Sequence, residues 1–283
     1  MTEEVYKLYK ESLPDIVRSE EIVKKILNDE DNHIITHRDH GRPVGVSVIN
    51  GNTIYLLCVD RSCQNRGIGD DLLKQTENHI ASAGHKKITL GAGKEYIMPG
   101  VPMDKGAHVF FKKRGYIHSW GDCGCVDMDQ MLENYDYNEL SIGDTINGIT
   151  YRWATVNDLS SITECVSDAD EGFVKYYLDK QIYEKGSCSP VLIAEKDNEV
   201  PGVIMVGIKT GYEDTGTLNC LATAHKHRNK GIATTLVRLG TKHLKDIGLS
   251  KSFLGYTYTE IVSMYSRVGY KVCMEYFMGE KEL

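Results

Sequence analysis

Two short segments of the sequence contain the residue types of an anion-binding loop. The first holds the small residues Gly67 and Gly69, and the second holds Gly231 and Ala233 at the same spacing. Small residues let backbone N–H groups converge, and the N-terminus of a following helix adds unpaired donors and a partial positive charge. Such a loop can bind a pyrophosphate group. The loop residues are Gln64, Asn65, Arg66, Gly67, Ile68 and Gly69 in the first segment, and Arg228, Asn229, Lys230, Gly231, Ile232 and Ala233 in the second.

Two common nucleotide-binding motifs do not fit these segments. The Walker sequence fails because Gly93-Lys94 is followed by Glu95 instead of Ser or Thr. The dinucleotide fingerprint fails because Leu72 stands where its third glycine is required. A single loop of this kind is also compatible with an ordinary strand-to-helix turn. Its occurrence twice in one chain favours a shared binding role.

A second pair of matching segments shows that the chain repeats itself. Phe110–Tyr116 and Met264–Tyr270 follow their respective loops, and both end in Gly-Tyr. The glycine loop and this downstream segment are farther apart in the sequence of the first copy, and the extra residues fall within Lys94–Lys105. The 283 residues therefore predict one domain written twice. We expect an N-terminal domain over residues 1–133, a polar linker over 134–148 and a C-terminal domain over 149–283.

The elements that position the loops follow the same order in both copies. Apolar runs between turn residues predict antiparallel strands before each loop, and a helical apolar period after it predicts an amphipathic helix. The first copy is expected to open with a helix over Leu13–Leu27. The predicted strands are His33–His37, Pro43–Ile49, Thr53–Val59 and Lys87–Leu90 in the first copy, and Val191–Glu195, Val200–Ile208, Thr217–Ala222 and Lys251–Leu254 in the second.

Composition excludes several classes of protein. The formal net charge of −7 disfavours a nucleic-acid binder. No stretch reaches the ~20 apolar residues of a membrane span, and the chain does not open with a secretory signal pattern. The eight cysteines lack zinc or Cys-x-x-Cys spacing, which predicts reduced thiols in a cytoplasmic protein. His33 and His37 lie on a strand-like run without a catalytic Glu, so no metal site is expected.

The loops and the downstream segments together resemble the GNAT superfamily of acyl-CoA-dependent N-acetyltransferases. Both loops are similar to the family's pyrophosphate loop, and Phe111–Tyr116 and Tyr265–Tyr270 are similar to its Tyr-x-x-x-Gly-Phe/Tyr element. Tyr151–Asp158 is similar to the family's opening strand and helix. The resemblance implies an α/β (α+β) fold of two tandem GNAT-like domains. Each would have a mixed, mostly antiparallel twisted sheet flanked by helices.

The resemblance also implies acetyl-CoA as co-substrate. In the family two strands are splayed apart to admit the pantetheine arm, and backbone groups of one of them bond the acyl carbonyl. The basic stretch 225–230 lies at the mouth of the second loop, where it would attract a phosphate-rich ligand. Carried over by position, the strand residues that would bind the cofactor are Leu57, Cys58 and Val59 in the first copy and Cys220, Leu221 and Ala222 in the second.

The two copies differ at the position of the family's catalytic tyrosine. A tyrosine hydroxyl is protonated at neutral pH and can donate its proton to the departing thiolate. The second copy has Tyr265 there, whereas the first has Phe111, which cannot donate. We therefore expect the C-terminal copy to be the catalyst. The first copy's loop is at least as close to consensus, and its expanded segment Met98–Pro102 could wall an acceptor pocket, so an N-terminal active site is the alternative.

The predicted reaction moves an acetyl group from acetyl-CoA directly to a primary amine of a small molecule. The general base is not identified by the sequence. Asn219 could orient a water, the candidate carboxylates are Glu195, Asp170, Glu171 and the C-terminal carboxylate, and Asp60 ends the corresponding strand of the first copy. Two other functions stay open. The chain could be a CoA-binding regulatory or structural module with little transfer activity, or an acyl-CoA hydrolase. Oligomeric state has no signal in the sequence.

Overall fold

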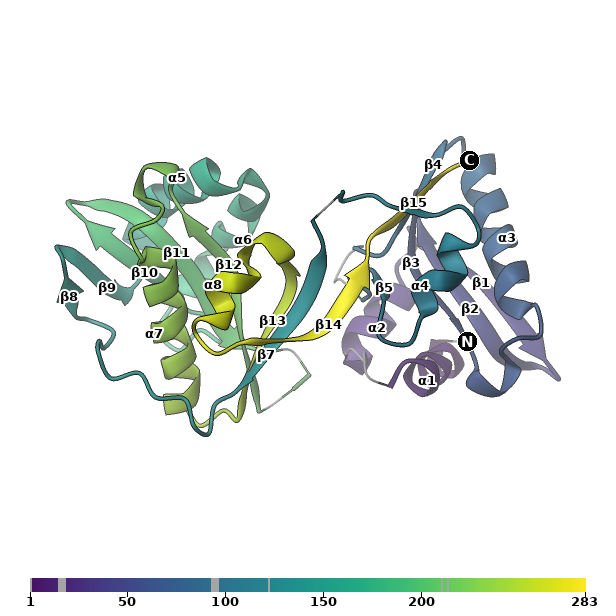
Figure 1. Ribbon diagram of the computed structural model, residues 1–283, viewed down its shortest axis with the longest axis horizontal. Coiled ribbons are helices and arrows are strands. Elements are labelled where there is room, and N and C mark those ends of the chain that lie inside the picture. The colour runs from purple at the N-terminus through teal and green to yellow at the C-terminus, as the bar shows by residue number, and fades with distance from the viewer. Residues whose placement is uncertain (1, 15–18, 93–96, 122, 210, 213) are drawn as a thin grey trace. The chain divides into compact units, whose positions relative to one another are not determined.

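The computed structural model describes residues 2–14, 19–92, 97–121, 123–209, 211–212 and 214–283 (Figure 1). The chain forms two compact units. Unit 1 comprises Met1–Val126, Tyr258–Glu260 and Met274–Leu283, and unit 2 comprises Asp127–Thr257 and Ile261–Cys273. None of the described helices combines the length and the apolar character that crossing a membrane requires.

The sheet of unit 1 has the strand order β1-β2-β3-β4-β15-β6. Strands β1 to β3 are antiparallel, and β3 pairs in parallel with β4. The predicted strands of the first copy are confirmed. The strand bounds are β1 His33–Asp39, β2 Arg42–Asn50, β3 Thr53–Val59, β4 Lys87–Leu90, β5 Val101–Pro102, β6 Ile117–His118 and β15 Gly279–Glu282.

Helices cover both faces of the unit 1 sheet. Helix α3 (Ile68–Ser82) buries the predicted stripe that includes Leu72 and Ile80, and α1 (Thr2–Ser12) and α2 (Glu20–Leu27) cover the other face. Ser19 is the N-cap of α2, and its hydroxyl accepts the Ile22 N–H at 3.4 Å. The helix expected over Leu13–Leu27 is thus observed only as α2, and residues 15–18 of it lie outside the described residues. The short helix α4 spans Ala107–Lys112.

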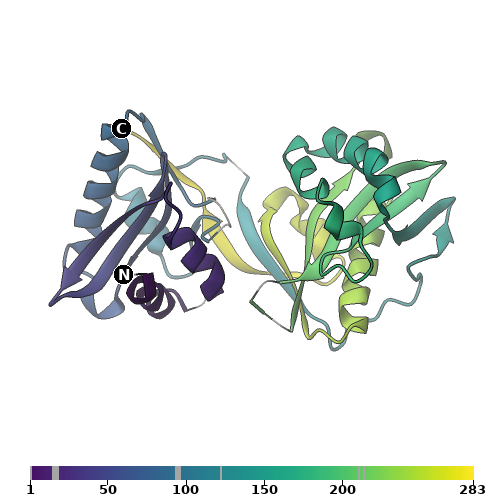
Figure 2. The same ribbon diagram turned by 180° about the vertical axis from the view of Figure 1, so that it is seen from behind.

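The second sheet has nine strands in the described residues, in the order β5-β14-β7-β13-β12-β11-β10-β9-β8, and all but the edge strand β5 lie wholly or partly in unit 2. Helix α7 (Ile232–Asp246) lies on one face, and α5 (Leu159–Ala169) with α6 (Val174–Tyr177) lies on the other (Figures 1 and 2). Helix α8 spans Val262–Ser266. The strand bounds are β7 Cys125–Met131, β8 Thr145–Ile146, β9 Ile149–Trp153, β10 Val191–Lys196, β11 Glu199–Ile208, β12 Thr215–Thr223, β13 Lys251–Tyr258 and β14 Lys271–Phe277.

The units do not follow the predicted domain boundaries, because one strand of each sheet comes from the other half of the chain. Strand β15 lies between β4 and β6 in the sheet of unit 1, and β7 lies between β14 and β13 in the second sheet. Strand β14 passes from unit 2 into unit 1 at Met274 and ends in a pairing of Phe277 with Val101 of β5. An uninterrupted C-terminal domain over 149–283 is therefore not what the structure contains.

The segment expected as a polar linker, residues 134–148, is part of unit 2. Tyr135 and Tyr137 are buried, and the Tyr135 hydroxyl donates to the Arg238 carbonyl of α7 at 3.2 Å. Lys245 of α7 donates in turn to the Tyr135 carbonyl at 2.5 Å. The two buried tyrosines and Lys245 thus anchor this stretch to α7. Sequence polarity alone does not reveal such anchoring.

Phe277 tests the assignment of the last strands to unit 1. It is 2% exposed in a core cluster with residues of α3 and β4, including Ile80 and Ile88. We expect Phe277→Ala to destabilise unit 1 by about 3–5 kcal/mol, because it leaves a cavity in that core. Urea unfolding with amide exchange should show faster exchange in α3 and unchanged exchange in α7. Leu254→Ala, a buried β13 residue of unit 2, is the reciprocal control and should loosen α7 instead. Loosening of α7 by Phe277→Ala would contradict the assignment.

Candidate active site

Each unit has a pair of parallel strands that are joined only at one end. In unit 1, β3 pairs with β4 at Thr53 and Ile54. In unit 2, β12 pairs with β13 at Thr215, Gly216 and Thr217, and no later pair forms in the described part of β12 although both strands continue. The later residues of β3 and β12 therefore have backbone groups on this side that are not used by the neighbouring strand. An extended ligand can bond them.

The opening in unit 2 is flanked by two residues in the left-handed backbone region. Cys220 has φ +50° and Tyr256 has φ +56°, and the register of the paired ends puts them level on β12 and β13. Cys220 lies in a β-bulge, because two residues of β12 face one residue of β11. Left-handed φ is uncommon for residues other than glycine, and such strain concentrates at functional sites.

Two buried polar contacts hold these left-handed residues in place. The Tyr177 hydroxyl donates to the Cys220 carbonyl at 2.6 Å, and Asp127 Oδ1 accepts the Tyr256 N–H at 3.0 Å. Both supporting side chains are almost completely buried. The sequence carried no signal for either contact. Neither left-handed residue is a glycine, and Asp127 stands in the half of the chain that was assigned to the other domain.

The two glycine loops have the same backbone conformation. In unit 1, Asn65 and Gly67 have φ +59° and +83°, and in unit 2, Asn229 and Gly231 have φ +61° and +80°. A Cβ added at either glycine meets no atom within 4 Å, so the space over both loops is open. Each glycine is the N-cap of a 15-residue helix without a side-chain cap, which leaves the first-turn N–H groups available.

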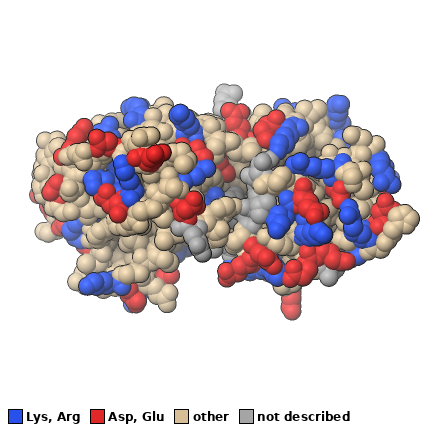
Figure 3. Space-filling view, turned by 90° about the horizontal axis from the view of Figure 1, so that it is seen from below, with Lys and Arg blue, Asp and Glu red and all other residues tan. Residues whose placement is uncertain are grey.

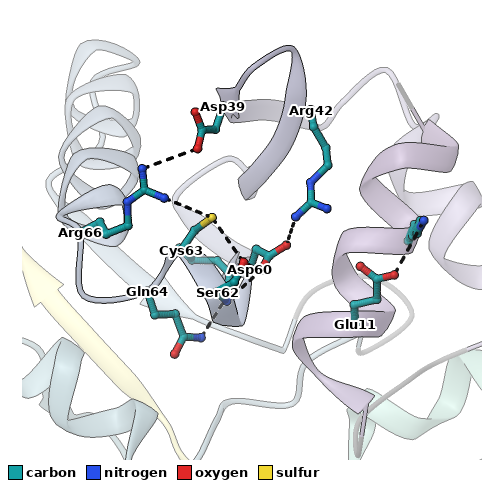
Figure 4. Close-up of polar contacts among 10 residues, drawn as sticks. Glu11, Asp39, Arg42, Asp60, Ser62, Cys63, Gln64 and Arg66 are labelled. Atoms are coloured by element: carbon teal, nitrogen blue, oxygen red, sulfur yellow. Dashed lines mark hydrogen bonds and ion pairs between the residues drawn. The ribbon is translucent and has the colours of Figure 1, made fainter.

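The first residue of each loop ties the loop to its strand. Gln64 Nε2 donates to the Val59 carbonyl at 3.2 Å, and Arg228 Nε donates to the Thr223 carbonyl at the same distance. These are equivalent positions of the repeat. The structure thus brings the predicted residues of each loop together at the end of the predicted strand, as Figure 4 shows for the first loop.

The cation of the first loop is paired with a carboxylate. Arg66 pairs with Asp39 at 3.6 Å, and beside the loop Arg42 of β2 pairs with Asp60 (Figure 4). Asp70 and Asp71 also stand in the first turn of α3, where carboxylates occupy the positive end of the helix. A phosphate group at this loop would therefore meet compensated charges.

The second loop keeps uncompensated cations. Lys230 Nζ donates to the Lys226 carbonyl at 3.0 Å, and within the described residues neither Lys230 nor Arg228 forms an ion pair. Glu199 pairs with Lys226 at 2.7 Å, and α7 has no acidic residue in its first turn. On the face shown in Figure 3, Lys and Arg side chains are interspersed with Asp and Glu. The second loop is the better electrostatic match for a pyrophosphate.

Tyr265 of α8 is near enough to Cys220 of β12 for that residue to affect its pKa. Tyr265 is 6% exposed, and its hydroxyl has no hydrogen-bond partner among the described residues. Burial, with smaller contributions from Tyr270 and Cys220, holds the pKa of Tyr265 well above its usual range. The hydroxyl therefore stays protonated at neutral pH. The equivalent Phe111 of unit 1 packs edge-on against Phe110 and Tyr116.

The strand residues of the two units are similar in exposure at most equivalent positions. Leu57 and Leu221 are both half-buried, and Cys58 and Ala222 are both buried. The units differ one position earlier, where Leu56 of β3 is buried in a cluster with Ile97 and Met98, whereas Cys220 of β12 is half-buried. Residues 97–102 of the expanded segment are buried, and Ile97 and Met98 pack in the cluster that contains Leu56 and Cys58 of β3. Residues 94–96 of that segment lie outside the described residues.

Comparison with known proteins agrees with this geometry. The sequence pattern described as "Acetyltransferase (GNAT) domain" matches residues 2–124, and that described as "Acetyltransferase (GNAT) family" matches residues 153–270. No curated protein matches the chain. Both matches end before the strands β7 and β15 that the two halves contribute to each other's sheets.

Three solved structures are similar over 99% of the chain. A fungal multi-domain β-N-acetylglucosaminidase, with a region described as a GCN5-related glucosamine N-acetyltransferase, has a TM-score of 0.78 and 20% identity. This chain spans 36% of its length. A GCN5-related N-acetyltransferase from Sphaerobacter thermophilus has a TM-score of 0.71 and 16% identity over 91% of its chain. A tandem GNAT protein from the clavulanic acid biosynthesis pathway has a TM-score of 0.70 and 14% identity over 94% of its chain.

The predicted fold class is confirmed. Each unit has the mixed, mostly antiparallel sheet flanked by helices that was expected, with a strand pair joined at one end and a glycine loop at the N-terminus of a long helix. The matched patterns together cover most of the chain, and the similar structures share the fold over nearly all of it. The chain therefore belongs to the GNAT acetyltransferases and contains two GNAT domains in tandem.

Proposed function

We propose that unit 2 transfers an acetyl group from acetyl-CoA to a primary amine of a small molecule. The observation that carries this proposal is the Tyr265 hydroxyl, which is unbonded within the described residues and belongs to a side chain electrostatically coupled to Cys220 of β12. A GNAT-type transfer needs a proton for the departing thiolate. Unit 1 has no hydroxyl at this position, because Phe111 occupies it.

The residues of unit 2 fit acetyl-CoA as co-substrate. The N–H groups of Gly231, Ile232 and Ala233 and the side chains of Arg228 and Lys230 would bind the pyrophosphate. The backbone groups of Cys220, Leu221 and Ala222 that β13 leaves unpaired would bond the pantetheine arm and the acyl carbonyl. Tyr265 would then donate its proton to the sulfur as the carbon–sulfur bond breaks.

Direct transfer is supported by the state of the strand cysteine. Burial, with a smaller contribution from Asp170, raises the pKa of the Cys220 thiol to about 12. Because the thiolate is the nucleophile of cysteine chemistry, this thiol is inert near neutral pH. An acyl-cysteine intermediate on Cys220 is therefore not part of the proposal. The amine attacks the thioester itself.

We infer that unit 1 is a structural partner. Arg66 of its loop is paired with Asp39, Asp70 and Asp71 stand in the first turn of α3, and Phe111 replaces the tyrosine. These observations weigh against the alternative of an N-terminal active site.

Calorimetric titration with acetyl-CoA tests which loop is occupied, and thiol release tests transfer. We expect one acetyl-CoA per chain, and thiol release that depends on an added amine. The amine panel consists of polyamines, amino acids, aminoglycosides, peptides and glucosamine, the last because the similar fungal region is described as acting on it. Absence of binding would overturn the proposal. Binding without release for any amine would favour a CoA-binding module, and release without amine would favour a hydrolase.

A further inference from the structure

Asp170 is a half-buried carboxylate at the end of α5, in the segment that lies over β12. It is the N-cap of a 3-10 turn at Glu171–Phe173, and its Oδ1 accepts the Gly172 N–H at 2.9 Å. Within the described residues its second oxygen, Oδ2, has no partner. One oxygen is therefore held by the backbone while the other remains free.

Contacts made by neighbouring residues place the segment of Asp170 beside Cys220 of β12. Its neighbours Ala169 and Phe173 pack against the same core cluster as Cys220. The hydroxyl of Tyr177, at the end of the same segment, donates to the Cys220 carbonyl at 2.6 Å. After burial, the charge of Asp170 is the next largest cause of the raised pKa of the Cys220 thiol. Packing, hydrogen bonding and electrostatics thus agree on its place.

An exposed amide lies on the same face of the sheet. Asn219 stands directly opposite Met205, and directly opposed residues of antiparallel strands project to the same side. Met205 packs in the cluster that holds Ala169 and Phe173. Asn219 accepts the Thr217 hydroxyl through Oδ1 at 3.1 Å, which leaves its amide nitrogen free in the described structure. The face is therefore polar beside Asp170.

The other carboxylates of unit 2 fit this role less well than Asp170. Glu171, on the same turn, is exposed, and no contact among the described residues places it beside Cys220. Three further carboxylates are hydrogen-bonded elsewhere: Glu195 to Arg152 at 2.5 Å, Asp168 to the His225 N–H at 2.5 Å, and Asp127 to the Tyr256 N–H at 3.0 Å. Of these carboxylates, Asp170 is the one beside the bulge with an oxygen to spare.

We propose that Asp170 binds the ammonium group of the acceptor and takes its proton, so that the acceptor of unit 2 is a cationic amine. This rests on the proposed function. The freed nitrogen lone pair forms the bond to the acyl carbon, and the carbon–sulfur pair leaves with sulfur, which takes the Tyr265 proton. A second nitrogen proton restores Tyr265 through water, and Asp170 releases its proton to solvent. One amide, one free thiol and one proton result.

Asp170→Asn is the variant that tests this role. Asparagine keeps the oxygen that accepts the Gly172 N–H, so the turn should be preserved. We expect kcat/KM for the amine to fall by about 100-fold or more at pH 7, the usual scale for a lost general base, with the Kd of acetyl-CoA unchanged. Asp179→Asn is the matched control, because Asp179 caps the next 3-10 turn and its Oδ1 accepts the Gln181 N–H at 3.0 Å.

A pH series separates proton transfer from a structural effect. The penalty of Asp170→Asn should shrink toward pH 9.5, because more of the amine is already neutral in solution. The groups near the carboxylate that could also titrate or alter its field are Lys175 and Glu171 on the same segment, Cys220 on β12 and Tyr265 on α8. Repeating the series in Tyr265→Phe shows whether the pH effect belongs to Asp170.

The outcomes distinguish this inference from the proposed function. Wild-type transfer with an equally active Asp170→Asn variant would overturn the inference alone. So would a penalty that does not vary with pH, or an equal loss in Asp179→Asn. If the wild type transfers to no amine in the panel, the proposed function fails and the role of Asp170 fails with it.

Discussion

Gly231→Glu is expected to weaken acetyl-CoA binding by more than about 100-fold, which corresponds to about 3 kcal/mol. The glutamate would place a negative charge at the N-terminus of α7, where the open space over the loop would otherwise receive phosphate. The left-handed φ of +80° adds about 1–2 kcal/mol of strain for any side chain. Calorimetric titration measures the loss.

Gly67→Glu is a closely matched control. Gly67 has φ +83°, no atom within 4 Å of an added Cβ and the same N-cap position on α3. Backbone strain and helix start are therefore alike in the two variants, and only the proposed occupancy of the loops differs. Binding should be unchanged in Gly67→Glu. The reverse pattern would transfer the cofactor site to unit 1, and Gly231→Ala measures the strain without the charge.

Tyr265→Phe is expected to lower kcat by about 100-fold or more while leaving the Kd of acetyl-CoA unaltered. The substitution removes only a hydroxyl that is unbonded in the described structure, so little stability is lost. The edge-on contact of the ring with Tyr270, whose centroid is 6.0 Å away, should persist. Steady-state and single-turnover thiol release measure the effect. An unchanged kcat with a good amine acceptor would show that Tyr265 only packs.

Tyr270→Phe separates catalysis from stability. The Tyr270 hydroxyl is bonded to Thr241 and Ser252 at 2.8 and 2.7 Å, and both partners are buried. Its loss leaves two buried hydroxyls short of a partner, at a cost of about 1–3 kcal/mol in unfolding free energy. The rate should remain near that of the wild type. Loss of the hydroxyl is thus expected to lower kcat but not stability at Tyr265, and to lower stability but not kcat at Tyr270.

Much of this architecture was predictable because it depends on local signals. Alternating apolar runs and the stripe of α7, from Ile232 to Leu244, identify their elements without knowledge of the fold. The paired glycines identify the loops, since only the backbone they allow turns the strand into the helix so closely. Because the chain repeats itself, the strands, loop and helix identified in one half were also expected in the other.

The parts that escaped prediction are set by distant contacts. Strand β15 is too short for its sequence to indicate which strands it pairs with, and its place between β4 and β6 depends on residues far away in the chain. The left-handed Cys220 and Tyr256 carry none of the residue preferences that mark such a backbone. They are held by Tyr177 and Asp127, which come from elsewhere in the sequence.

The placement of β7 and β15 has a consequence for biosynthesis. Domains usually fold in the order in which they leave the ribosome. Here unit 1 begins first, but the gap between β4 and β6 can be filled only after residues 279–282 emerge, behind every residue of unit 2. Strand β7, by contrast, has been made before the rest of unit 2's sheet. The half that is translated second can therefore close its sheet first, and the earlier half waits with two open strand edges.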